Sequence, residues 1–253
     1  MEQQGEAPYL SVVVPAHNEA ARLGATLQAM HKYLQDQGYR YEIVVVDDVS
    51  RDATGEVARS FQAAAPTLRV LRRNANPGKG AAVQAGMLAA RGRYVLFSDA
   101  DNSTPIDQTA KLLAALEAGY DIAIGSRALP DSNLVVRQPW YREGMGRIFN
   151  LLVRLVALRQ FVDTQCGFKC FRQEVSRELF SHQTVAGWAF DVEVLFMALR
   201  RGYRVAEIPV TWINSRESRV SPVRSSLQML RDLLGLRWKQ LCGRYRWTQR
   251  KQA

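Results

Sequence analysis

The sequence is poor in cysteine and histidine, which excludes a scaffold held together by disulfides or by a zinc cluster. Its 253 residues include three cysteines, Cys166, Cys170 and Cys242, and three histidines. An odd and small number of cysteines makes no disulfide framework and favours a reducing compartment. Cys166 and Cys170 have no histidine or further cysteine close to them in sequence, so we expect small buried side chains rather than zinc ligands.

Long hydrophobic runs are also missing. No stretch approaches the ~20 apolar residues of a membrane-spanning helix, and the longest candidate, residues 148–158, contains Arg154. The polar and acidic segment 1–8 lacks the basic and then apolar pattern of a signal peptide. We therefore expect that any contact with a membrane is made at its surface.

Acidic residues are scarce towards the C-terminus. The whole chain has a net charge of +10, with 34 Lys or Arg and 24 Asp or Glu. Residues 216–253 contain ten basic and two acidic residues, a net charge of +8, so the rest of the chain is nearly neutral. A basic segment of this kind indicates an anionic partner, such as lipid headgroups, a phosphorylated substrate or nucleic acid.

Short apolar runs alternate with helical patterns in the first half of the sequence. We expect strands at 10–14, 41–46, 68–71, 93–97 and 121–124, and helices at 19–34, 54–64, 81–90 and 106–117. Apolar strands between amphipathic helices are typical of a mostly parallel sheet covered on both faces. The predicted fold class is therefore α/β.

The second half has a less regular pattern. It predicts polar loops at 126–141 and 214–221, helices at 144–158 and 190–199, and a strand at 204–208. A long helix over 222–245 has an apolar stripe and a basic remainder; the stripe consists of Leu227, Leu230, Leu234, Trp238, Leu241 and Tyr245. We divide the chain into a tail at 1–8, a domain at 9–221, and a basic amphipathic helix and tail at 222–253.

Polar clusters follow three of the predicted strands. They are Pro15-Ala-His-Asn-Glu19, Asp47-Asp48 and Asp99-Ala-Asp101. Ligands of open α/β sheets bind at the carboxyl ends of the strands, so the three clusters should face one crevice. Any one of them alone is more simply explained as a helix cap or turn. Together they favour a cation held between carboxylates.

Asp99 and Asp101 are spaced so that both side chains share one face while Ala100 turns away. Mg²⁺ and Mn²⁺ sites of this kind combine few protein carboxylates with phosphate oxygens and water, which suits a metal–diphosphate complex. Lys79 lies in Asn76-Pro-Gly-Lys-Gly80, which opens a predicted helix where an anion could bind. A simple turn explains that segment equally well.

In order along the chain, these motifs and Gly125-Ser-Arg127 resemble the family-2 glycosyltransferases, which have the GT-A fold. The segments Asp163-Thr-Gln-Cys-Gly-Phe-Lys-Cys-Phe171 and Gly187-Trp-Ala-Phe-Asp-Val-Glu193 are similar to the dolichyl-phosphate glucosyltransferase branch. The resemblance covers about residues 9–240. It implies transfer of glucose from UDP-glucose to dolichyl or another polyprenyl phosphate, with inversion to a β-linked product.

The resemblance also implies roles for individual residues. The residues that would bind the nucleotide-sugar are Pro15, Asn18, Glu19, Asp47, Asp48, Lys79, Asp99, Ala100 and Asp101. The ligands of Mg²⁺ or Mn²⁺ would be Asp99 and Asp101. The acceptor phosphate would be bound by Arg127, Arg216 and Arg219. The catalytic residues would be Asp99, Asp101, Arg127 and Asp191, with Asp191 orienting the sugar or the acceptor.

Two residues depart from the family pattern. Val49 stands where a glycine is usual, and a β-branched residue resists the positive φ that such a glycine often serves. Either the turn here does not need that φ, or it is strained and nucleotide binding is weakened. Asn102 stands where an apolar residue is common, and we expect little effect.

The nature of the acceptor decides whether a base is needed. A phosphate monoester is largely ionised at neutral pH and can attack without one, whereas a hydroxyl acceptor would need a base, for which Asp191 is the natural candidate. Alternatives within the family are mannose from GDP-mannose or glucuronic acid on the same lipid, or glucose on a hydroxyl.

Three other classes of protein agree less well with the sequence. A sugar-nucleotide pyrophosphorylase normally has a Gly-rich basic loop directly after the first strand, where this chain has Pro15-Ala-His-Asn-Glu19. The regular apolar stripe and the carboxylate crevice speak against a nucleic-acid-binding protein. The intact Asp99 and Asp101 argue against an inactive donor-binding protein. With a lipid acceptor, we expect a protein at the cytosolic face of a membrane, attached peripherally through its C-terminal helix. We expect no nucleic-acid partner.

Overall fold

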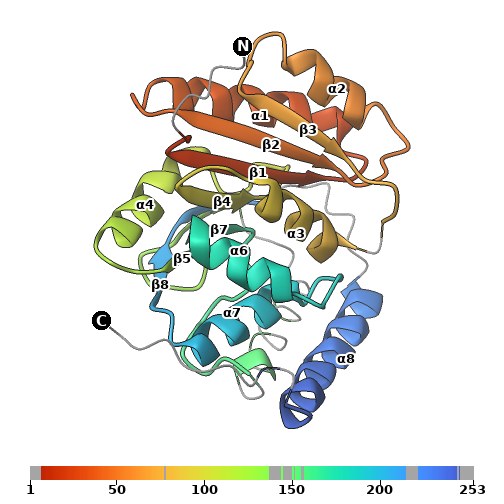
Figure 1. The fold of residues 1–253 in the computed structure, drawn as a ribbon, viewed down its shortest axis with the longest axis vertical. Helices are drawn as coiled ribbons and strands as arrows, with labels where there is room; N and C mark the ends of the chain where they lie inside the picture. Colours follow the sequence, from red (N-terminus) through yellow and green to blue (C-terminus); the bar gives the residue numbers. More distant parts are fainter. Residues whose placement is uncertain are drawn as a thin grey trace.

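The computed structural model describes residues 7–76, 78–136, 144, 150, 152–154, 157–214, 222–243 and 245. A seven-stranded sheet lies at its centre, with the strand order β3-β2-β1-β4-β7-β5-β8 (Figure 1). The strands are β1 (Leu10–Ala16), β2 (Tyr41–Asp47), β3 (Leu68–Arg72), β4 (Tyr94–Ser98), β5 (Ile122–Ser126), β7 (Phe168–Arg172) and β8 (Val205–Pro209). Neighbouring strands are parallel except where β7 pairs with β4 and β5, so the predicted mostly parallel sheet is confirmed.

Helices cover both faces of this sheet (Figure 1). One face carries α1 (Ala20–Gln35), α2 (Thr54–Phe61) and α4 (Thr109–Glu117), with a 3₁₀ turn, Ile106–Gln108, before α4. The other face carries α3 (Lys79–Ala89), α6 (Gln173–His182) and α7 (Phe190–Arg201). Successive strand residues point to opposite faces, so Val12 and Val14 join one apolar cluster and Val13 joins the other.

The structure corrects the prediction for the second half of the chain. The sequence patterns do not predict β7 or α6. The predicted loop at 126–141 contains a strand, β6 (Asn133–Val136), which pairs with β9 (Thr211–Ile213) in a separate two-stranded sheet. The predicted helix at 144–158 and the predicted loop at 214–221 lie mostly outside the described residues.

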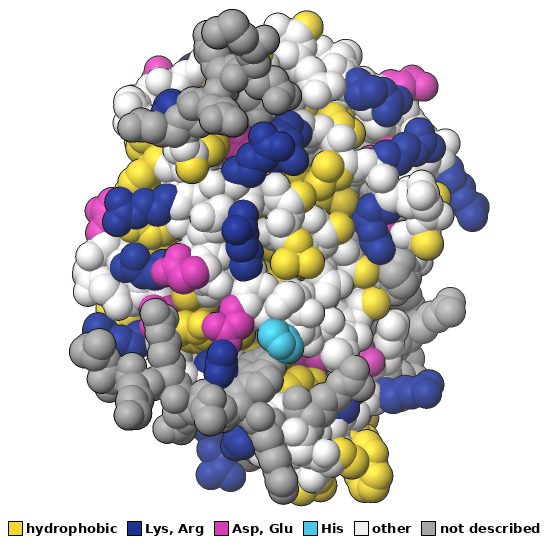
Figure 2. Space-filling model, viewed as in Figure 1, with side chains coloured by type: hydrophobic (Ala, Val, Ile, Leu, Met, Phe, Trp, Pro, Cys, Tyr) yellow, Lys and Arg dark blue, Asp and Glu magenta, His cyan; other side chains and the backbone are white. Residues whose placement is uncertain are grey.

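The C-terminal helix α8 (Pro222–Leu241) packs on the α7 side of the molecule. Its buried side chains are Met229, Leu233 and Leu236. Three members of the predicted apolar stripe instead point outward: Leu234, Trp238 and Leu241 are 59%, 69% and 76% exposed, whereas Tyr245 is 3% exposed. Figure 2 shows hydrophobic side chains at the surface on the lower right, where Figure 1 places α8. The helix therefore has a buried apolar side and a second, exposed apolar side.

No helix among the described residues combines the length and the apolar character needed to cross a bilayer.

Candidate active site

The carboxyl ends of β2, β1 and β4 lie next to one another at one edge of the sheet. Ala16 at the end of β1 pairs in register with Asp47 at the end of β2, and Asp99 directly follows β4. Because the three strands are parallel and adjacent, the structure brings the three predicted polar clusters together.

Hydrogen bonds connect the turn after β1 to the turn after β2. The Asn18 backbone N–H donates to Ser50 Oγ at 3.1 Å, and Asn18 Oδ1 accepts from the Arg51 N–H at 2.8 Å. A His17 ring nitrogen lies 2.7 Å from the Asp48 carbonyl oxygen. Asn18 and Val49 both adopt positive φ, 57° and 58°, so the turn does use the conformation that glycine would favour.

The acidic side chains of these turns form hydrogen bonds and ion pairs with other residues of the chain. Asp47 and Asp48 are 1% and 3% exposed. Asp47 Oδ1 accepts from the Ser50 N–H at 3.0 Å, and Asp48 Oδ1 lies 2.6 Å from an Arg73 nitrogen. Burial raises the pKa of Asp48, and Arg73 opposes that rise. Glu19 pairs with Arg22, one turn further along α1, and Pro15 on β1 is half-buried.

The segment Asp99-Ala-Asp101 exposes its two carboxylates and buries the residue between them. The Asp99 and Asp101 side chains are 32% and 22% exposed, whereas Ala100 is 5% exposed and its carbonyl oxygen accepts from Thr26. Asp101 Oδ1 also accepts from the Ser103 N–H at 3.0 Å. Ala100 therefore turns inward while both carboxylates reach the surface; that Asp99 and Asp101 share one face stays a prediction.

These two carboxylates fit the donor set expected for Mg²⁺ or Mn²⁺ beside a diphosphate. Within the described ranges, no group of three or more His, Cys, Asp or Glu side chains could hold a metal ion. A pair of partly open carboxylates leaves the remaining positions of a hard cation to phosphate oxygens and water.

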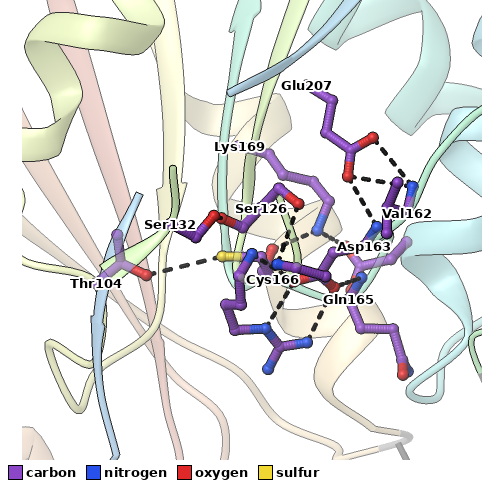
Figure 3. A network of polar contacts seen from close by, with 12 residues as sticks. Thr104, Ser126, Ser132, Val162, Asp163, Gln165, Cys166, Lys169 and Glu207 are labelled. Atoms are coloured by element: carbon purple, nitrogen blue, oxygen red, sulfur yellow. Dashed lines mark hydrogen bonds and ion pairs between the residues drawn. The ribbon is translucent and has the colours of Figure 1, made fainter. Parts of the chain in front are cut away.

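A buried ion pair lies beside this segment. Lys169 on β7 is 2% exposed, and its Nζ is 2.9 Å from Asp191 Oδ1 at the start of α7. Lys169 also donates to the Cys166 carbonyl oxygen (Figure 3). Burial raises the pKa of Asp191, and the ammonium groups of Lys169 and Lys79 oppose that rise. Lys169 is missing from the residues that the sequence predicts for the site, although a lysine inside an otherwise apolar strand could have indicated it.

Arg127, which follows β5, is held by a buried carboxylate. Its Nε and Nη2 lie 2.7 Å and 2.9 Å from the two oxygens of Asp163, which is 1% exposed. Burial alone would raise the pKa of Asp163, but the Arg127 guanidinium outweighs burial and lowers it to about 2. Burial disfavours the charged guanidinium, but Asp163 outweighs burial and raises the pKa of Arg127. Arg127 is therefore a fixed cation.

Further hydrogen bonds hold the segment that carries Asp163 in place. Glu207 on β8 accepts from the backbone N–H groups of Val162 and Asp163 (Figure 3), the latter at 2.8 Å. The Arg127 guanidinium also lies over the Trp212 ring of β9, 5.6 Å from its centroid. Neither Asp163 nor Glu207 is predicted as a site residue, because each acts through partners far away in sequence. Arg216 and Arg219 lie outside the described residues.

Comparison with known proteins agrees with this geometry. Residues 11–180 match the family model described as glycosyl transferase family 2. The dolichyl-phosphate beta-glucosyltransferase of Drosophila melanogaster is 40% identical over 250 residues, which cover 94% of this chain and 77% of that protein. The protein of the same description from Homo sapiens is 36% identical over 256 residues, covering 96% and 79% of the two chains.

Solved structures show the same fold at low sequence identity. Mannosyl-3-phosphoglycerate synthase from Rubrobacter xylanophilus has a TM-score of 0.70 at 20% identity, covering 94% of this chain and 76% of that one. Glucosyl-3-phosphoglycerate synthase from Mycobacterium tuberculosis, in complex with Mn²⁺, UDP and glucosyl-3-phosphoglycerate, has a TM-score of 0.69 at 20% identity and covers 90% and 80%. The chain therefore belongs to glycosyl transferase family 2 and is a glycosyltransferase with the GT-A fold.

Proposed function

We propose that this glycosyltransferase moves glucose from UDP-glucose to dolichyl or another polyprenyl phosphate. The observation that carries the proposal is a fixed cation, Arg127, at the same edge of the sheet as the two partly open carboxylates of Asp99 and Asp101. Arg127 follows β5 and Asp99 follows β4, and both strands run antiparallel to β7, which lies between them. A donor diphosphate at Asp99 and Asp101 and an acceptor phosphate at Arg127 would therefore meet at this edge. The names of the relatives, dolichyl-phosphate beta-glucosyltransferases, support the choice of sugar and acceptor.

The donor side of the proposed site is the edge formed by β1, β2 and β4. There Pro15, Asn18, Glu19, Asp47 and Asp48 would surround the nucleotide, and Lys79 with the Asp99-Ala100-Asp101 segment would face the diphosphate. Mg²⁺ or Mn²⁺ bound by Asp99 and Asp101 would supply the positive charge that stabilises UDP as a leaving group.

The acceptor side is formed by the second half of the chain. A phosphate oxygen of the acceptor attacks the anomeric carbon of glucose. The bond from that carbon to the UDP oxygen breaks, and UDP leaves with the electron pair. Attack from the face opposite UDP inverts the α-linked donor to a β-linked product. Arg127 orients the acceptor phosphate, with Arg216 and Arg219 as further phosphate ligands.

Asp191 has a different role in the two possible acceptor classes. With a phosphate acceptor it accepts no proton, and its ion pair with Lys169 suits a carboxylate that orients a sugar hydroxyl. With a hydroxyl acceptor, its raised pKa would suit a general base. The phosphate is the preferred acceptor because the relatives are named for dolichyl phosphate and because Arg127, held by Asp163, supplies a fixed cation.

The exposed apolar side of α8 supports a place at a membrane surface. Leu234, Trp238 and Leu241 point outward, and Arg231, Arg237 and Lys239 lie on the same helix. An exposed apolar stripe with basic neighbours binds the interface of an anionic bilayer. We propose that α8 holds the enzyme peripherally on the cytosolic face, where its lipid acceptor lies.

Donor and metal are tested together in one transfer assay. The protein is incubated with a short polyprenyl phosphate and labelled UDP-glucose or GDP-mannose, in Mn²⁺ or Mg²⁺ and in EDTA. We expect labelled lipid from UDP-glucose alone, lost in EDTA and in a folded Asp101→Ala variant. Labelled lipid from GDP-mannose would contradict the choice of sugar, and full activity in EDTA would contradict the metal.

A further inference from the structure

Each carboxylate of the proposed metal site already faces a cation of the chain. Lys79 Nζ lies 2.6 Å from Asp99 Oδ1, and an Arg22 nitrogen lies 3.8 Å from Asp101 Oδ2. Arg22 is also paired with Glu19 and is the more distant of the two cations. The lysine therefore forms the closer and more specific contact.

The ammonium group of Lys79 is held where it lies. Lys79 is the first residue of α3, and its Nζ lies between two aromatic rings, 5.3 Å from the Phe97 centroid and 5.2 Å from the Trp188 centroid. Its side chain is 21% exposed. Two rings and a carboxylate therefore stabilise the ammonium at this position.

Asp99 cannot easily turn away from this cation. Its backbone N–H donates to the Gly167 carbonyl oxygen at 3.1 Å. A Cβ on Gly167 would lie only 1.9 Å from Asp99 Oδ2, so the carboxylate is packed directly against that glycine. Gly167 therefore packs against one oxygen of Asp99, Oδ2, and Lys79 contacts the other, Oδ1.

We propose that Lys79 is a built-in counterion that holds the metal position at Asp99 until a nucleotide diphosphate arrives. This inference rests on the proposed metal site at Asp99 and Asp101. A divalent cation that binds Asp99 must displace the ammonium, and two cations that share one carboxylate repel each other. A diphosphate offers the displaced ammonium a new anionic partner. Metal and nucleotide therefore bind with positive coupling, and metal alone binds weakly.

The test measures Mn²⁺ binding directly, from the electron paramagnetic resonance signal of free Mn²⁺, with and without UDP. We compare the unchanged protein with Lys79→Met and with Lys32→Met, an exposed lysine on α1 that serves as the control for net charge. Without UDP, Lys79→Met should bind Mn²⁺ about tenfold tighter than the unchanged protein, because a charged hydrogen bond no longer competes. UDP should then strengthen its Mn²⁺ binding less than it does in the unchanged protein.

The inference is overturned if Lys79→Met, folded by circular dichroism, binds Mn²⁺ alone no tighter than the unchanged protein and the Lys32→Met control. Lys79→Gln provides a second neutral side chain in case the methionine variant does not fold. An Asp99→Asn variant separates the two proposals. If it keeps full Mn²⁺ binding in the presence of UDP, the proposed metal site itself is wrong.

Discussion

Val49 adopts a backbone conformation that a β-branched side chain resists, with φ of 58° in the turn that follows β2. A residue with a Cβ in the left-handed conformation costs about 1–2 kcal/mol of stability. Replacing it by glycine removes that cost but lowers stability by about 0.5–1 kcal/mol, because glycine has more conformational freedom in the unfolded chain. We expect Val49→Gly to raise the free energy of unfolding by about 1 kcal/mol, with a thermal midpoint a few degrees higher.

The control for this prediction is Val49→Ala, which keeps a Cβ and should gain much less. Urea denaturation of the three proteins gives the comparison. A glycine variant less stable than the unchanged protein would show that Val49 contributes packing that outweighs its strain.

Among the carboxylates that the structure describes, Asp163 is the one whose ionisation the fold most clearly stabilises. Its pKa falls from 3.8 to about 2, so its contribution to stability is present above pH ~4 and is lost as the pH falls towards 2. Asp163→Asn should lower the free energy of unfolding by ~3 kcal/mol at neutral pH, since it leaves a mostly buried guanidinium without its partner. The difference from the unchanged protein should shrink between pH 4 and pH 2.

Unfolding in urea at several pH values measures this difference. Asp131→Asn, at an exposed loop position, is the matched control and should show little difference at any pH. A stability loss in Asp163→Asn that stays constant down to pH 2 would contradict the assigned ion pair with Arg127.

At the scale of helices and strands, α8 has two apolar sides and only one of them is buried. Replacing both Leu234 and Trp238 by Glu should weaken binding to anionic phospholipid vesicles about tenfold or more, because their apolar surface then no longer enters the interface. Both side chains are exposed, so the free energy of unfolding should change little.

Co-sedimentation with vesicles measures that binding. The matched control is Leu236→Ala on the buried side, which should cost ~3 kcal/mol of stability and leave vesicle binding of the folded protein unchanged. If the double Glu variant binds vesicles as well as the unchanged protein does, the exposed side of α8 is not the lipid contact.

The elements that the sequence predicts are those with a clear local pattern. The first five strands, β1 to β5, follow apolar runs. Their predicted ends lie within two residues of the ends that the structure shows. The sequence does not predict β7, because Lys169 interrupts its apolar run and because its place between β4 and β5 depends on pairing with distant strands. Either apolar stripe of α8 could face the protein, and packing with α7, not local sequence, decides which one does.

Across the whole molecule, the two halves of the chain supply different parts of the site. The first half provides the carboxylates at the ends of β1, β2 and β4, which the sequence could place because parallel strands end at a common edge. The second half provides the Arg127–Asp163 and Lys169–Asp191 pairs. Arg127 and Asp191 could be named from motifs, but their partners depend on contacts between distant segments.

We propose that the acceptor is a phosphate fixed by Arg127, and a comparison of two acceptors tests this. Transfer of labelled glucose from UDP-glucose is compared between a polyprenyl phosphate and the polyprenol of the same chain length, with Mn²⁺ present. We expect labelled lipid from the phosphate and essentially none from the alcohol, with a β-linked product. Transfer to the alcohol at an equal or higher rate would show that a phosphate acceptor is not required and would make Asp191 the base of a different reaction.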